Sequence, residues 1–153
     1  MMNGKFWLFL VANFMALAIG SFFMGDATSS NWYLNLVRAP WTPPGWMFGP
    51  AWTIIMICFA FFMSEAWKVC ESPNSLLAFY LLQWTLNAAW PILFFQHQLI
   101  FFALYTILLL TVVVGLFLFR FKSLLRWKII FITPYFIWLI LASSLNAYIC
   151  IYN

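Results

Sequence analysis

Five long apolar runs divide the chain, and short polar or proline-bearing segments separate them. A helix that crosses a bilayer needs about 20 mostly apolar residues, and each run reaches that length. The pattern predicts transmembrane helices over residues 6–25, 46–67, 75–95, 99–119 and 128–151. These helices account for nearly the whole chain, so we expect a single all-α transmembrane domain over residues 1–153.

The composition supports a location in the lipid bilayer. Of the 153 residues, 67% are hydrophobic and only 7% are charged, whereas a soluble domain carries about 25% charged residues. So few charges cannot cover the surface of a soluble protein, and lipid must be the solvent for most of the chain. The net charge of +4 is too dispersed to predict nucleic-acid binding. We expect no metal site, because the three cysteines lack metal-ligand spacing.

Lysine and arginine indicate how the chain crosses the membrane. Six of the seven lie near the N-terminus, in the turn over 68–74 or in the turn over 120–128, whereas Arg38 alone lies on the other side. The positive-inside rule then places the N-terminus in the cytoplasm. The loop after the first helix and the C-terminus are expected on the opposite side.

The segment over 38–52 is the most unusual part of the sequence. It holds four prolines, three tryptophans and two glycines between two apolar runs. So much rigid backbone and ring surface predicts an ordered loop that leads into a helix and presents aromatic faces.

Three of the predicted helices each present a face that mixes aromatic rings, amides and small residues. These residues include Trp52 in the second helix, Asn87 in the third, and Tyr135, Trp138, Ala142 and Asn146 in the fifth. In the fifth helix the spacings of three, four and four place all of them on one side. Broad stacking surfaces with a few polar groups predict a cavity for a flat, largely apolar molecule. The alternative is that these side chains only hold the helices together, as polar residues commonly do in membranes.

Several motifs follow one another in a fixed order along the chain. They are Trp32-Tyr33, Pro40-Trp41-Thr42-Pro43-Pro44-Gly45-Trp46, Ala51-Trp52-Thr53, Leu86-Asn87-Ala88-Ala89-Trp90, Pro134-Tyr135-Phe136-Ile137-Trp138 and Ala142-Ser143-Ser144-Leu145-Asn146. Together they resemble the TspO/MBR family of translocator proteins, over nearly the whole chain. The resemblance implies five transmembrane helices, a homodimer, and a ligand cavity capped by the loop between the first two helices. In the first helix Ala12, Ala16 and Gly20 recur every four residues, and this small-residue stripe is one candidate for the dimer face.

The resemblance also implies a ligand class. Family members bind tetrapyrroles such as protoporphyrin IX and haem, as well as drug-like isoquinolines and benzodiazepines, and some bind sterols. Certain bacterial members promote light- and oxygen-dependent breakdown of protoporphyrin. By this resemblance Trp52 and Trp138 have a photochemical role and also bind ligand. The further ligand-binding positions that it implies are Tyr33, Trp41, Asn87, Tyr135, Ala142 and Asn146.

Two departures from the family pattern bear on function. Ile55-Met56 stands where the family often has Leu-Tyr, and Tyr148 is not followed by the basic residue of the animal sterol motif. The second departure favours a bacterial cell membrane over an animal one. We interpret the chain as a tetrapyrrole receptor that requires no cofactor and is linked to porphyrin degradation and stress signalling. An enzyme that degrades porphyrin, and a transporter of porphyrins or other apolar solutes such as sterols, remain the alternatives.

Overall fold

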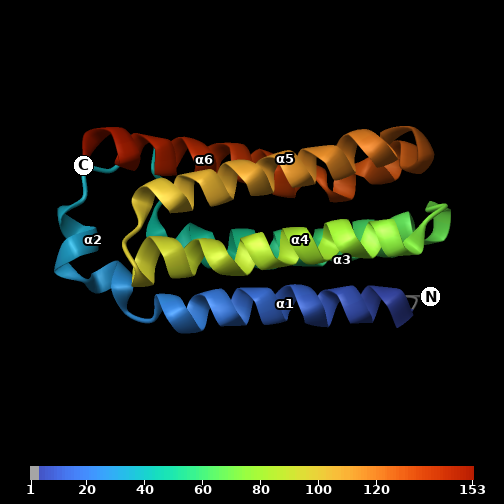
Figure 1. Ribbon diagram of the computed structural model, residues 1–153, viewed down its shortest axis with the longest axis horizontal. Coiled ribbons are helices and arrows are strands. Elements are labelled where there is room, and N and C mark those ends of the chain that lie inside the picture. Colours follow the sequence, from blue (N-terminus) through green and yellow to red (C-terminus); the bar gives the residue numbers. More distant parts are fainter. Residues whose placement is uncertain (1–3) are drawn as a thin grey trace.

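The computed structural model describes residues 4–153 and consists mainly of five long helices that lie side by side (Figure 1). The long helices are α1 (Gly4–Met24), α3 (Phe48–Val69), α4 (Pro73–Pro91), α5 (Ile100–Leu125) and α6 (Thr133–Tyr152). All five stretches are long and apolar enough to cross a membrane. This confirms the predicted all-α class with five transmembrane helices. The domain predicted over 1–153 also includes residues 1–3, which lie outside the described part.

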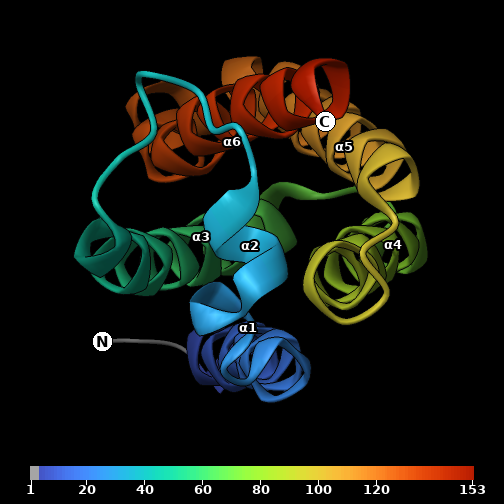
Figure 2. The same cartoon turned by 90° about the vertical axis from the view of Figure 1, so that its left-hand side faces the viewer.

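Short helical segments join the long helices. They are 3₁₀ turns over Ala27–Ser29, Gly45–Met47 and Arg126–Phe131, the short helix α2 (Asn31–Asn35), and a π-helical turn over Ile92–Gln96. Figure 2 shows α1 on one side of the bundle and α5 and α6 on the other, with α3 and α4 between them. The loop that contains α2 crosses the end of the bundle where the C-terminus lies.

Two helix boundaries differ from the sequence prediction for physical reasons. Helix α5 continues to Leu125, beyond the predicted end at residue 119, because Phe121 and Leu125 keep its apolar face buried. Helix α6 begins at Thr133, later than the predicted residue 128. Pro134 therefore lies in the first turn of α6, where its missing N–H group costs little.

Pro91, in contrast, lies at the far end of a helix. It ends α4, and the chain continues as the π-helical turn. Proline removes a backbone hydrogen bond and crowds the preceding turn, so a change of helical winding at this point follows.

Small residues bring α1 close to α4. Ala16 is buried, and a Cβ atom placed on Gly20 would lie 2.9 Å from Cγ of Pro91. The stripe of small residues therefore serves a contact within the chain, as helix approach in membranes requires. Because α4 covers Gly20, the suggestion that this stripe forms a dimer face is wrong.

We expect Gly20→Ala to destabilise the protein by about 1 kcal/mol. The overpacking against the rigid Pro91 ring costs about 1–3 kcal/mol, and a gain of about 0.5–1 kcal/mol from replacing glycine within a helix offsets part of it. The matched control is Gly49→Ala in α3, where an added Cβ meets nothing within 4 Å. Thermal unfolding in one detergent should show a lower transition for the Gly20 variant only. Equal transitions for both variants would contradict the close approach of α1 and α4.

Candidate functional site

Three of the predicted site residues form one aromatic cluster between α3 and α6. The ring centroids of Trp52 and Trp138 lie 6.4 Å apart with an interplanar angle of 77°, and those of Trp52 and Tyr135 lie 6.0 Å apart at 72°. Phe48, one turn before Trp52, adds a contact to Trp138 at 5.5 Å. These edge-to-face arrangements are favourable, and they leave part of each half-buried indole without an aromatic neighbour.

An apolar hollow of about 400 Å³ lies beside this cluster, with Trp138 in its wall. It is lined from α3 by Ala51, Ile54 and Ile55, from α6 by Thr133, Pro134, Ile137 and Trp138, and by Ile130. Ile54, Ile130 and Ile137 are each more than half exposed, so the hollow opens sideways between α3 and α6. No residue of the loop between α1 and α3 lines it. Access to Trp138 therefore runs from the side of the bundle.

A buried amide of α4 contacts the tyrosine of this aromatic cluster. Gln83 of α4 is 1% exposed and Tyr135 is 0% exposed, and Nε2 of Gln83 donates a hydrogen bond to the Tyr135 hydroxyl at 2.7 Å. Oε1 of Gln83 has no hydrogen-bond partner within residues 4–153. A buried acceptor without a partner costs about 1–3 kcal/mol, so this atom marks a place that suits a hydrogen-bond donor. Sequence reasoning left Gln83 out of the site, although its spacing of four residues from Asn87 on a helix was a usable signal.

Asn87 lies one turn further along α4 on the same face as Gln83. Its side chain is buried and makes no hydrogen bond to another residue of the described chain. Its amide can both donate and accept. Gln83 and Asn87 together give this face of α4 hydrogen-bonding capacity that the protein itself does not use.

Asn146, in contrast, is engaged by its neighbours. Its Oδ1 accepts a hydrogen bond from Nε1 of Trp90 at 2.9 Å, and its Nδ2 donates to the carbonyl of Ile100 at 3.3 Å. Ala142, one turn earlier, is half-buried against the main hydrophobic core. The structure thus places Asn146 as a link from α6 to α4 and α5, away from the paired indoles.

The two loop residues predicted for the site lie apart from each other. The Tyr33 ring contacts Phe95 at 5.6 Å, and the Arg38 guanidinium lies 5.5 Å from the Tyr33 ring centroid. Nε1 of Trp41 donates to Oγ of Ser144 at 3.1 Å. Ser144 and Ala142 are two positions apart on a helix and so point to different sides. The structure does not bring Trp41 onto the face of Ala142 and Asn146.

In the other half of the bundle, the buried Asn13 side chain has a hydrogen-bond partner for each of its polar atoms. Nδ2 of Asn13 donates to the carbonyl of Met56 at 3.0 Å, and Oδ1 of Asn13 accepts from the Tyr80 hydroxyl at 2.8 Å. Asn13 is 1% exposed and both of its polar atoms are used. This group connects α1, α3 and α4, and we assign it to helix association.

The fold and this cluster define an integral membrane protein of five helices with an aromatic, amide-bearing face. The family model described as "TspO/MBR family" matches residues 8–152, and the chain belongs to this family. Among its relatives is the "Tryptophan-rich protein TspO" of Archaeoglobus fulgidus, 33% identical over 149 residues, which cover 94% of this chain and 96% of that protein. The "Tryptophan-rich sensory protein" of Cereibacter sphaeroides is 34% identical over 118 residues, covering 75% and 72%. The human "Translocator protein" is 27% identical over 142 residues, covering 90% and 83%.

These matches confirm the resemblance inferred from the tryptophan and proline motifs. Membership in this family supports a role in binding or transport within a membrane. The relatives differ in what their names describe, a sensory protein in one and a translocator in the other. The choice of ligand and of activity therefore depends on the site itself.

Proposed function

We propose that this protein is a membrane receptor for a tetrapyrrole such as protoporphyrin IX or haem. The observation that carries the proposal is the pair of indoles, Trp52 and Trp138, beside an apolar hollow that opens toward the bilayer. A flat, apolar macrocycle dissolves in lipid and stacks well on indole faces. The hollow of about 400 Å³ is open along the side of the bundle, so it offers one apolar face on which a flat molecule can stack.

We propose the following mode of binding for such a ligand. The macrocycle enters from the side between α3 and α6 and stacks on Trp138, and its edge points toward the interior. Oε1 of Gln83 accepts a hydrogen bond from a donor on that edge, such as a protonated propionic acid group, and the Asn87 amide pairs with a second polar atom. Tyr33, Trp41, Ala142 and Asn146 belong to the ligand site in the family resemblance, and we propose them as residues that shape its end near the loop.

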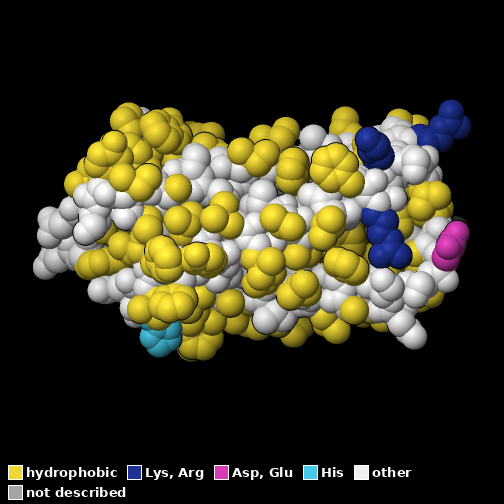
Figure 3. All heavy atoms as spheres, turned by 45° about the horizontal axis from the view of Figure 1, so that its top comes forward, with side chains coloured by type: hydrophobic (Ala, Val, Ile, Leu, Met, Phe, Trp, Pro, Cys, Tyr) yellow, Lys and Arg dark blue, Asp and Glu magenta, His cyan; other side chains and the backbone are white. Residues whose placement is uncertain are grey.

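The distribution of charge indicates which end of the protein faces the cytoplasm. On the face that Figure 3 shows, the visible lysine and arginine side chains gather at one end of the molecule, and the histidine lies at the other end. By the positive-inside rule this end, with the N-terminus, lies in the cytoplasm, and the loop with α2 lies on the opposite side. We also propose that the protein acts in a bacterial cell membrane and forms a homodimer through a face other than Gly20.

Titration of protoporphyrin IX into the detergent-solubilised protein tests the receptor proposal. We expect a saturable shift of the porphyrin absorbance, and Asn87→Leu should weaken the affinity several-fold because a buried polar contact to the ligand is lost. The matched control is Thr85→Val, since Thr85 is exposed on the same helix and its hydroxyl bonds only to the carbonyl of Leu81. No absorbance change in the parent protein, or equal losses in both variants, would overturn the proposal.

Two further measurements separate the receptor from its alternatives. Product analysis after illumination distinguishes a binding protein from one that degrades porphyrin, for which the indoles would act as electron donors or as traps for reactive oxygen. Uptake of porphyrin into sealed vesicles beyond the bound amount would indicate transport, the activity that the names of the mammalian relatives suggest. A receptor yields no degradation product above the protein-free control, and it takes up no porphyrin beyond the bound amount.

A further inference from the structure

The whole net charge of the protein lies at one end. That end carries six of the seven basic residues and two of the three acids, whereas Arg38 and Asp26 balance each other in the loop at the opposite end. Side-chain contacts gather several of these groups: Nζ of Lys5 lies 3.9 Å from the Trp67 ring, and Arg120 donates to Ser75 at 3.2 Å. The positive-inside rule accounts for the number of bases at this end but not for their arrangement.

A groove of about 270 Å³ lies among these charges, between the end of α3 and the turn that follows α5. Glu65 and Val69 line it from α3, and residues 124–128 line it from the other side. The groove thus lies where α3 and α5 end.

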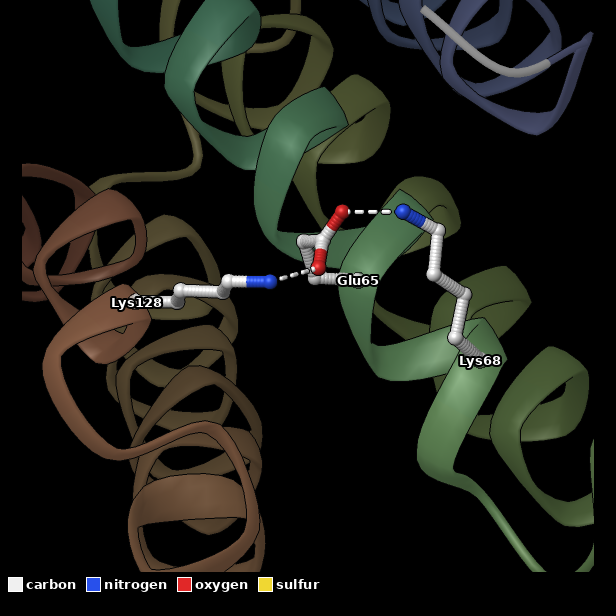
Figure 4. A network of polar contacts seen from close by, with 3 residues as sticks. All are labelled: Glu65, Lys68 and Lys128. Atoms are coloured by element: carbon white, nitrogen blue, oxygen red, sulfur yellow. Dashed lines mark hydrogen bonds and ion pairs between the residues drawn. The ribbon is translucent and has the colours of Figure 1, made fainter. Parts of the chain in front are cut away.

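The Glu65 carboxylate forms an ion pair with Lys128, and both residues line this groove. Glu65 bonds to the ammonium groups of both Lys68 and Lys128, so it joins α3 to the turn after α5 (Figure 4). Arg126 is different, because its guanidinium makes no hydrogen bond or ion pair with any side chain between residues 4 and 153. Two lysine ammonium groups therefore share one carboxylate, and the remaining cation that lines the groove is a planar guanidinium suited to bidentate contact with a phosphate.

The backbone at Arg126 is strained. Its φ of 54° lies in the left-handed region, which favours glycine over arginine. Its backbone N–H group bonds to the carbonyl of Lys122 and ends α5 at this point. A strained residue persists where the surroundings determine its conformation, and such residues gather at ligand sites.

Apolar surface adjoins the free guanidinium. Trp127 is 71% exposed and Leu124 is 53% exposed, and both line the groove. Tryptophan is enriched at the level of lipid headgroups. A cationic site for a phosphate beside a strip of exposed apolar side chains matches a molecule with an anionic head and a hydrocarbon tail.

We propose that this groove binds an anionic phospholipid of the surrounding membrane. The lipid phosphate pairs with the Arg126 guanidinium, with Lys128 as second cation, and an acyl chain lies along Leu124 and Trp127. This site is at the far end of the bundle from the loop with α2, and it shares no lining residue with the hollow beside Trp138.

Native mass spectrometry of the protein in detergent with added phosphatidylglycerol or phosphatidylcholine tests the proposal. We expect several-fold more phosphatidylglycerol than phosphatidylcholine to be retained. Arg126→Gly should lower phosphatidylglycerol binding about fivefold, the value expected for one base at a lipid surface. Because glycine accepts the positive φ, this variant should unfold at the same temperature as the parent or higher. The matched control is Lys122→Gln, a base of the same end that does not line the groove.

Three results would overturn the proposal. Equal losses of phosphatidylglycerol in Arg126→Gly and Lys122→Gln would show diffuse attraction to the basic end and no specific site. Equal retention of the two lipids would remove the role of the anionic head. Displacement of phosphatidylglycerol by glycerol phosphate at comparable concentration, together with unchanged binding in Trp127→Ala, would show a site for a soluble phosphate.

Discussion

Replacing both Trp52 and Trp138 by alanine is expected to weaken protoporphyrin IX binding about 100-fold. Stacking of a flat ring system on an aromatic side chain contributes about 1–3 kcal/mol, as alanine substitutions at stacked bases show, and 1.4 kcal/mol corresponds to a factor of ten. Each single variant should therefore lose about tenfold. The affinities follow from porphyrin fluorescence or absorbance titrations in the same detergent.

The control for this prediction is a tryptophan outside the site. Trp7 of α1 is exposed and contacts Phe6, so Trp7→Ala should leave porphyrin affinity within about twofold of the parent, as expected for a distant independent position. Trp52→Phe and Trp138→Phe keep a ring at each position and should each retain more affinity than the alanine variant. Unchanged affinity in the double alanine variant would move the ligand away from the space between α3 and α6.

The sequence was sufficient to predict the five helices but not where each one ends. Run length alone sets the number of membrane spans, since about 20 apolar residues are needed for each. The start of α6 depends on Pro134, which can lie either inside a helix or in its first turn. The buried positions of Phe121 and Leu125 extend α5 past the exposed Arg120 and Lys122, and this burial depends on contacts with other helices.

Helical spacing predicts which candidate site residues share one face of a helix, but it does not predict which residues of different helices meet. Spacings of three and four residues place Tyr135 and Trp138 on one face of α6, and the structure brings Trp52 of α3 to that face. The partner of Asn146 was not predictable, because Trp90 reaches it only at one relative rotation of α4 and α6. The lateral opening of the hollow likewise depends on the separation of α3 and α6, about which periodicity carries no information.

The pair of Gln83 and Tyr135 is the strongest candidate for coupling between the fold and the site. Tyr135 contacts Trp52 at 6.0 Å and also receives the hydrogen bond of Gln83. The same tyrosine therefore joins the aromatic cluster to α4. Because one end of the Gln83 amide is bonded and the other is free, the two halves of this side chain can be tested separately.

Tyr135→Phe is expected to destabilise the protein by about 1–3 kcal/mol, since it leaves both polar ends of Gln83 buried without partners. Gln83→Leu should cost less, because it also removes the unpaired Oε1 while keeping similar volume. The double variant should be more stable than Tyr135→Phe alone, a non-additivity that thermal unfolding of the four proteins measures directly. Tyr105→Phe on the exposed side of α5 is the matched control and should leave the transition unchanged.

The same set of variants tests whether the free amide oxygen faces the ligand. A ligand that binds only the folded protein raises its stability by RT ln(1 + [L]/Kd). If protoporphyrin IX donates a hydrogen bond to Oε1 of Gln83, saturating ligand should stabilise the parent more than it stabilises Gln83→Leu, by about 1 kcal/mol. Equal stabilisation of the two proteins, with strict additivity in the unliganded cycle, would show that Gln83 neither couples to Tyr135 nor contacts the ligand.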